Sequence, residues 1–434
     1  MINVSQAYRE AVRENREFCI ADEATFPDGS ELTFTVDDLM AYSINEATSE
    51  SGKFQIGAAV IKEYSATLDN SEEKFDRYQF EGTDIQAKTG LKLADGSWEY
   101  LDKGTYRVVQ AKQVDLTINI KAYDNMLYFD RPYSESSLAY PASVNQIIQD
   151  ASTVCQVTYD ASSIVNGSLI IPERPKDDAI TFRDVISYCA QLMGRYAKIN
   201  HLDALEFSWY PSMDTGIIDA GVAKNLAYPS ADNIIDGGSF SSMPEDIISA
   251  GDFSGTLEYH HFYDLKSKSI NTDDITITGI QVAVYKEKDQ VVQYGTEGYV
   301  IAIEDNPLIQ NSDIAQTAAQ TAGAGIVGMS FRPLSVTAQS DPCIEAGDAA
   351  IISEDWKKPA VATVITNTTF SFGGGQKIDC TAETPTEKTY TRYSAKTRII
   401  AESKQDAEEQ LNAYDLAVQQ MNQLAANTFG FFST

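Results

Sequence analysis

Histidine and cysteine are the residues that most often bind zinc or act as nucleophile and base. This chain has only three histidines among 434 residues. His260 and His261 are adjacent, so in a strand their side chains would point to opposite faces and could not bind the same ion. His201 stands alone, and the sequence has no GxSxG, HExxH or GxxxxGK[ST] motif. We therefore predict no catalytic site, no metal site and no cofactor.

The cysteines are scattered and never occur in CxxC or CxH spacing. They are Cys19, Cys155, Cys189, Cys343 and Cys380. An odd number without a spacing pattern favours reduced thiols that pack as small apolar side chains. We expect most of them to be buried.

Carboxylates are abundant, but adjacent pairs such as Asp177-Asp178, Asp273-Asp274 and Glu408-Glu409 do not face one cleft. Glycosidase carboxylates come from distant positions that lie ~5 to 9 Å apart in space, so glycan hydrolysis stays open as an alternative. The run from Asp341 to Asp348 lacks the alternating Asp/Asn ligands and the terminal Glu of an EF-hand loop. We expect a turn that leads into a strand.

Charge is the unusual quantity, because 33 basic and 63 acidic residues give a formal net charge of -30. This balance disfavours binding to DNA, RNA or an anionic membrane. The first 15 residues lack the apolar segment of a signal peptide, and no run approaches the ~20 apolar residues of a membrane span. We expect synthesis in a cytoplasm, without a secretion signal or membrane insertion.

Residues 1–135 are predicted to form a first antiparallel β-barrel-like domain with a short N-terminal helix. Two Asp-Gly turns, Asp28-Gly29 and Asp95-Gly96, join segments with strand character and supply the positive φ of tight hairpins. From Val114 to Ala122 apolar residues alternate with polar ones, which predicts a strand with one buried face. This strand should complete the sheet.

Residues 136–226 are predicted to form an α/β insert. Ser143 with Gln146 and Thr181 with Asp184 have the spacing of helix N-terminal caps. Each is followed by an apolar stripe at helical spacing. Short strands are expected at residues 169–171, 196–199 and 205–209.

Residues 227–274 are rich in Ser, Gly, Asp and Pro and are predicted to be a connecting region with short strands. Residues 275–392 are predicted to form a second β-barrel-like domain. Its apolar residues alternate at odd positions before Gly279 and at even positions after it, so we expect a β-bulge at Gly279. An Ala-rich helix at 314–326 interrupts the strands, and residues 363–372 should pair with 377–383 across Gly373-Gly374-Gly375.

The final segment, residues 393–434, is predicted to be a helix followed by an apolar tail. One apolar row has the spacing of a heptad seam. Its members are Ala407, Leu411, Tyr414, Val418, Met421 and Ala425. The row predicts either self-association around an axis or packing on the chain's own domain. The aromatic residues Phe429, Phe431 and Phe432 then need a partner or another part of the fold to cover them.

The fold class is therefore α+β multidomain, with two small β-barrel-like domains flanking an α/β insert. Several sequence stretches, taken in order, are more particular than this architecture. They are Phe54-Gln-Ile-Gly57, residues 64–70, Ala122-Tyr-Asp-Asn-Met126, residues 129–134, Tyr140-Pro-Ala142 and residues 340–348. Together they resemble the tail baseplate hub proteins, or N-terminal regions of tail-associated proteins, of bacteriophages that infect Gram-positive bacteria. The resemblance covers most of residues 1–390.

This resemblance implies a homotrimer in which the two β domains of each subunit alternate in a pseudo-sixfold ring at the virion tail tip. The ring would join a sixfold tail tube or distal tail protein to a threefold central spike, fibre or tape-measure protein. It would be made in the bacterial host cytoplasm. DNA would pass through it without specific binding, and a negatively charged lumen would be consistent with the acidic composition.

Two functions of other classes remain open from the sequence. One is a peptidoglycan-degrading tail-tip enzyme, because relatives of such hubs sometimes carry lytic domains. The other is a glycan-binding adhesin, which the 23 tyrosines favour. We expect a structural protein that is not an enzyme.

Overall fold

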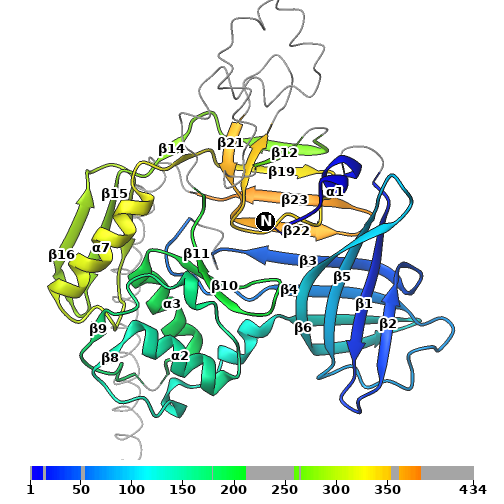
Figure 1. The fold of residues 1–434 in the computed structure, drawn as a ribbon, viewed down its shortest axis with the longest axis horizontal. Helices are drawn as coiled ribbons and strands as arrows, with labels where there is room; N and C mark the ends of the chain where they lie inside the picture. The colour runs from blue at the N-terminus through cyan, green and yellow to red at the C-terminus, as the bar shows by residue number, and fades with distance from the viewer. Residues whose placement is uncertain are drawn as a thin grey trace, which may run out of the picture. The chain divides into compact units, whose positions relative to one another are not determined.

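Strands outnumber helices in the computed structural model, which describes residues 2–12, 16–49, 54–177, 179–211, 259–262, 265–352 and 361–382. The chain divides into two units, Met1–Ala382 and Glu383–Thr434, and the described residues all belong to the first. Figure 1 shows their arrangement. The helix and tail predicted for residues 393–434 lie outside the described residues.

The two Asp-Gly hairpins are confirmed. Strand β1 (Phe18–Thr25) pairs with β2 (Glu31–Thr35), and β5 (Asp84–Lys92) pairs with β6 (Trp98–Val114). Gly29 has φ +82° and Gly96 has φ +87°, conformations that glycine adopts without strain. The N-terminal helix is also present, as α1 (Gln6–Ala11) with Ser5 as its N-cap.

The strand predicted from Val114 begins later. Val114 is the last residue of β6, and Asp115 has φ +50° in a tight turn. The following strand is β7 (Thr117–Tyr123). Val114 and Leu116 are 41% and 60% exposed, so their alternation with Ile118 reflects two strands joined by a turn rather than one buried face.

The two predicted β domains share one sheet. Strand β3 (Leu39–Ala47) pairs on one side with β4 (Glu63–Asp69) and on the other with β22 (Asn367–Ser371). The resulting sheet has eleven strands, in the order β13-β19-β23-β22-β3-β4-β7-β6-β5-β1-β2. Over the described residues this sheet is open rather than a closed barrel, and Figure 1 shows β3 beside β22 at its centre.

The α/β insert matches its prediction closely. Helix α2 (Val144–Cys155) begins with a capping box of Ser143 and Gln146, and α3 (Phe182–Met193) begins with one of Thr181 and Asp184. The predicted apolar stripes face the core. Strand β10 (Tyr196–Ile199) pairs with β11 (Leu205–Ser208), and β8 (Ala142–Ser143) pairs with β9 (Ile170–Ile171).

The shift of the apolar residues from odd to even positions at Gly279 marks a break between two sheets and not the predicted bulge. Strand β14 (Ile275–Thr276) pairs with β18 (Ser330–Phe331). Strand β15 (Gly279–Val284) starts a different sheet with β16 (Glu287–Gly295) and β17 (Val300–Ile303). The bulge lies at Ala283/Val284 instead. The Ala-rich helix is confirmed as α7 (Ser312–Ile326), capped by Asn311.

The predicted strand at 363–372 is two strands. Strand β21 (Val361–Val364) pairs with β20 (Ala349–Ile352), whereas β22 pairs with β23 (Gly375–Cys380) across the glycine turn. The remaining strands are β12 (Tyr259–Phe262), β13 (Ser267–Ile270) and β19 (Leu334–Ala338).

Two large hydrophobic cores lie behind these elements. One lies behind strands β1 to β7, which we call the first β unit, and there Phe34, Phe75 and Phe80 pack their rings together. The other contains α2, α3 and α7 together with residues from β14, β15, β19 and β23. This second core crosses the predicted boundary at residue 275, and the domain boundaries themselves stay predictions.

Gly194 ends α3 at the point where α3 contacts α7, and it provides a test of this packing. Its φ is +64°, and a Cβ added there would lie 2.5 Å from the Cα of Ala322. We expect Gly194→Ala to lower the free energy of unfolding by about 2 kcal/mol or more, through backbone strain and overlap.

The matched control is Gly325→Ala, because a Cβ at Gly325 of α7 would meet nothing within 4 Å. This change should stabilise the protein by about 0.5 to 1 kcal/mol through helix propensity. Urea unfolding measures both. Equal effects of the two variants would contradict the close approach of α3 and α7.

Candidate functional site

The residues predicted to mediate self-association all lie outside the described residues. They are Ala407, Leu411, Tyr414, Val418, Met421, Ala425, Phe429, Phe431 and Phe432. Their role stays a prediction.

Histidine, cysteine and the carboxylates are the residue types that most often carry chemistry. Among the described residues, no group of three or more His, Cys, Asp or Glu side chains is placed to hold a metal ion. All five cysteines are free thiols and four are buried, as predicted. Burial raises the pKa of Cys155 to about 12, so this thiol stays protonated at neutral pH.

No helix within the described ranges is long and apolar enough to cross a membrane.

The segment from Asp341 to Asp348 forms turns that lead into β20, as predicted. The carboxylate of Asp341 accepts a hydrogen bond from the backbone N–H of Cys343 at 3.1 Å, and that of Asp348 accepts one from Glu345 N–H at 2.9 Å.

Five charged side chains meet in the interior, and we call them the buried charge cluster: Glu46, Lys62, Lys103, Lys198 and Glu345. Lys103 Nζ lies 3.2 Å from Glu46 Oε1, and Lys62 Nζ lies 3.7 Å from Glu46 Oε2. Glu345 is 4.0 Å from Lys62 and 3.8 Å from Lys198. Four of these side chains are at most 6% exposed, so the charges interact in a medium of low polarity.

The buried charge cluster connects distant parts of the fold. Glu46 lies in β3 and Lys103 in β6, while Lys198 lies in β10 of the α/β insert. Glu345 comes from the loop before β20. Lys62 precedes β4. We call the strands within the predicted second β domain, residues 275–392, the second β unit. The cluster therefore joins the first β unit, the α/β insert and the second β unit at one point.

Hydrogen bonds fix the loop that carries Glu345. Lys103 Nζ donates to the carbonyl oxygens of Pro342 at 2.9 Å and Ile344 at 3.4 Å. The backbone N–H of Ala346 donates to Glu46 Oε2 at 3.4 Å. A Cβ at Gly347 would lie 2.0 Å from the hydroxyl oxygen of Tyr196, and its φ is +101°, so only glycine fits there.

Mutual pairing keeps the cluster charged. Burial alone would raise the pKa of Glu46, but Lys103 and Lys62 lower it below its usual value. In Glu345, burial is likewise outweighed by Lys198 and Lys62, and the pKa lies well below its usual value. Burial would lower the pKa of Lys103, but Glu46 and Glu345 raise it. These carboxylates are therefore ionised at neutral pH and cannot serve as general acids.

None of these five residues was predicted from the sequence, although two of them left a signal. Glu46 follows Tyr42 and Ile44 at the buried positions of β3. Lys103 follows Leu101 in the same way in β6. A charged residue on the same side of a strand as its buried apolar residues indicates a buried partner of opposite charge.

Two further aspartates are buried, with different surroundings. Asp22 in β1 accepts hydrogen bonds from Lys88 N–H at 2.8 Å and from the Tyr64 hydroxyl at 2.9 Å. Burial raises its pKa to about 7, although these hydrogen bonds act in the opposite direction. Burial also raises the pKa of Asp124 to about 7, against the attraction of Lys62. Both carboxyl groups titrate near neutral pH.

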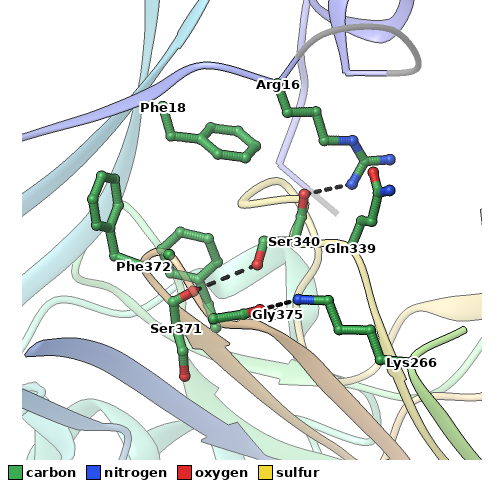
Figure 2. A pocket seen from close by; sticks show the side chains of 11 residues that line it. Arg16, Phe18, Lys266, Gln339, Ser340, Ser371, Phe372 and Gly375 are labelled. Atoms are coloured by element: carbon green, nitrogen blue, oxygen red, sulfur yellow. Dashed lines mark hydrogen bonds between the residues drawn. The ribbon is translucent and has the colours of Figure 1, made fainter. Parts of the chain in front are cut away.

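A shallow pocket of about 180 Å³ lies beside the glycine turn between β22 and β23. Figure 2 shows Phe18 and Phe372 facing the cationic side chains of Arg16 and Lys266 across it. Arg16 donates to the Ser340 carbonyl at 2.6 Å, and Lys266 donates to the Gly374 carbonyl. The pocket is basic and aromatic, in a chain that is strongly acidic.

The side of the large sheet that points away from the cores is lined by short hydroxyl and amide side chains over strands β19, β22, β3, β4 and β7. We call it the polar face. Its members are Ser43, Asn45, Ser65, Thr67, Asn119, Ser335, Thr337, Asn367, Thr369 and Ser371. Two ion pairs lie among them, Glu63 with Lys121 at 2.9 Å and Lys377 with Asp379 at 3.0 Å.

The buried charge cluster makes a direct prediction for stability. We expect Lys103→Met to lower the free energy of unfolding by about 3 to 5 kcal/mol, because Glu46 would lose its closest cation in a dry interior. The control is Lys88→Met, which breaks a surface pair with Glu23 and should cost about 1 kcal/mol or less. Urea unfolding compares them. A cost for Lys103→Met no greater than for the control would refute the role of the cluster.

Asp22 makes a prediction for pH dependence. Its folded-state pKa of about 7 lies above its unfolded value of about 4, so its stabilising contribution is full below pH 4 and is lost as pH rises to 7. We expect Asp22→Asn to gain stability relative to wild type by about 1.4 kcal/mol per pH unit over this range, with no further gain above it.

The control for this titration is Asp28→Asn. Hydrogen bonds from Ser30 lower the pKa of Asp28, so this carboxylate stays ionised from pH 4 to 7. Its stability difference from wild type should be flat over that range. Urea unfolding at several pH values measures both differences, and a flat profile for Asp22→Asn would show that Asp22 does not titrate there.

Comparison with solved structures finds phage tail proteins, while no protein-family model and no curated protein sequence matches the chain. A tail protein from Neisseria meningitidis has TM-score 0.45 and 9% identity, covering 82% of this chain and 94% of its own. The prophage MuSo2 43 kDa tail protein from Shewanella oneidensis has TM-score 0.46 and 10% identity, covering 83% and 96%. Prophage tail protein gp18 from Listeria monocytogenes has TM-score 0.44 and 9% identity, covering 85% and 95%.

Proposed function

We propose that this chain is a structural, non-enzymatic component of a phage tail baseplate, and that it acts as a homotrimeric hub. In this role the two β units of three copies alternate in a ring that joins the sixfold tail tube to a threefold central spike or fibre. The tail role is taken from the order and spacing of the sequence motifs described above. A Gram-positive host and location at the virion tail tip belong to the same proposal.

The observation that carries the proposal is the continuity of the large sheet. Pairing of β3 with β22 makes one wall from both β units, and the buried charge cluster holds the units in that arrangement. A ring subunit must keep its two wall segments in a constant relation, because any change would alter the width of the passage. A continuous sheet supported by a dry ionic cluster meets that requirement.

The polar face suits the inner surface of such a ring. Hydroxyl and amide groups offer phosphates only neutral hydrogen bonds, and two of the lysines on this face are paired with carboxylates. Duplex DNA is held mainly by unpaired cations, so a wall of this kind would let it slide. In this proposal the wall is polar with paired charges, rather than the strongly negative wall expected from composition.

The first test is the molecular mass of the purified full-length protein. We expect trimers, or monomers that form trimers when mixed with tube, distal tail, spike or tape-measure proteins from the same particle. Analytical ultracentrifugation distinguishes these cases. A stable monomer that ignores every tail component would rule out the hub role.

The predicted heptad row offers a matched pair of variants in the same experiment. Leu411→Asp with Val418→Asp should weaken assembly if the row mediates self-association, because two carboxylates would be buried in the contact. Gln410→Asp with Gln419→Asp adds the same charge outside the row and should leave assembly unchanged. Equal assembly of both variants would assign the row to packing within its own domain.

A further inference from the structure

Asp124 lies where the first β unit leads into the α/β insert. It follows β7 directly and is the N-cap of the short 3-10 helix η2 (Asn125–Phe129), which contacts β6, α2, α3 and β10. Its Oδ1 accepts a hydrogen bond from Met126 N–H at 3.1 Å, and its own N–H donates to the carbonyl oxygen of Lys62 at 3.2 Å. The backbone and one carboxyl oxygen therefore hold Asp124 in place at this junction.

The second carboxyl oxygen of Asp124 is buried without a partner. The residue is 3% exposed, and Oδ2 has no hydrogen-bond partner among the described residues. A buried polar atom in this state costs free energy, so a nearby donor that could reach it would gain by doing so. The titratable groups that act on Asp124 are Lys62 before β4, Glu46 in β3 and Tyr106 in β6. Asp124 thus borders the buried charge cluster.

The other charged groups on the elements packed against η2 have contacts of their own. Lys103 of β6 and Lys198 of β10 belong to the buried charge cluster. Outside it, the contacts are Arg107 with Asp84, Arg183 with Asp130, Asp184 in the capping box of α3, and Asp150 beside Cys155. Thiols and phenols here stay neutral near pH 7, because burial raises the pKa of Cys155, Cys189, Tyr188 and Tyr196. Burial raises the pKa of Asp124 only to about 7, so its charge changes near neutral pH.

Lys62 is the cluster member that is held most loosely. Its Nζ lies 3.7 Å from Glu46 and 4.0 Å from Glu345, whereas hydrogen bonds from nitrogen to oxygen span about 2.7 to 3.2 Å. Lys103 Nζ, by contrast, donates to two backbone carbonyl oxygens. The buried charge cluster also has three ammonium groups for two carboxylates. An ionised Asp124 would supply the missing third carboxylate.

We propose that Lys62 is a proton-controlled switch that changes its carboxylate partner. While Asp124 is protonated, Lys62 stays with Glu46 and Glu345. When Asp124 ionises, the ammonium group of Lys62 turns on its flexible stem toward Asp124 Oδ2 and moves away from Glu345. Glu345 keeps Lys198, so no buried charge is left alone. The loop before β20 that carries Glu345 is then held less firmly.

The direction of the effect follows from the two arrangements. Pairing with Lys62 favours the ionised form of Asp124, so the pKa of Asp124 is lower after the switch than before it. The switched arrangement therefore gains as pH rises toward 7 and gains no more above it, where Asp124 is ionised in both arrangements. The inference concerns a single chain, so it holds or fails independently of the proposed trimer.

Hydrogen exchange of the full-length protein, followed by mass spectrometry, tests the switch. The probe is segment 343–348, in which Ala346 N–H donates to Glu46 Oε2. After correction for the intrinsic effect of pH, protection of this segment should fall by about three- to tenfold per pH unit between pH 5 and 7, because one proton is linked to the change. Above pH 7 it should level off. A flat wild-type profile would overturn the switch without any variant.

Asp124→Asn removes the proton from the switch. Asparagine keeps an oxygen that can accept from Met126 N–H but cannot ionise, so protection of the segment should stay at its acid value at every pH. Asp22→Asn is the matched control, because burial also raises the pKa of Asp22 to about 7 but Asp22 lies in β1 beside Tyr64. This control should keep the wild-type profile. The same pH dependence in Asp124→Asn as in wild type would contradict the proposal.

Amides at the centre of β5 separate the switch from unfolding of the whole chain. Their protection should respond to both aspartate substitutions, whereas segment 343–348 should respond to Asp124→Asn alone. Equal changes in both segments of the wild-type protein would mean ordinary unfolding and overturn the switch. Lys62→Met is a second variant, which should lower protection of segment 343–348 at pH 5 and abolish its pH dependence. Persistence of that dependence without Lys62 would also refute its role, so either variant decides if the other fails to fold.

Discussion

The structure depends on a requirement of electrostatics, namely that ions removed from water must find partners. Three ammonium groups and two carboxylates meet in the buried charge cluster, and each is contributed by a different segment of the chain. If one segment moved away, it would leave a buried charge without a partner, at a cost of several kcal/mol. The cluster thus couples the first β unit, the α/β insert and the loop before β20.

This coupling explains how one sheet can cross both β units. Strands β3 and β22 pair over five residues, a short contact by itself. Glu46 lies in the same strand β3, so the cluster and the strand pairing fix the same element from two sides. One consequence is a continuous polar face. Another is that the two ends of the sheet stand in a constant relation to each other.

The proposed role as a ring subunit draws on extended surfaces and not on a reactive group. The ionised carboxylates of the cluster are committed to lysines, and the pocket beside the glycine turn is shallow and open. The described surface with chemical character is instead an extended one, the polar face. Extended surfaces serve assembly and passage, which need area and shape rather than a single reactive group.

Local features could be predicted from the sequence because their causes lie within a few residues. The Asp-Gly hairpins, the capping boxes and apolar stripes of α2 and α3, and the Ala-rich helix α7 belong to this group. Errors of placement at Val114, at Gly279 and in the segment 363–372 arose because alternation of apolar residues does not reveal where one strand ends and the next begins. Strand β3, the buried charge cluster and the joining of the two β units depended on the tertiary structure. Ala346 and Glu46, which share a hydrogen bond, lie 300 residues apart, and no local pattern encodes a contact between segments so far apart in the chain.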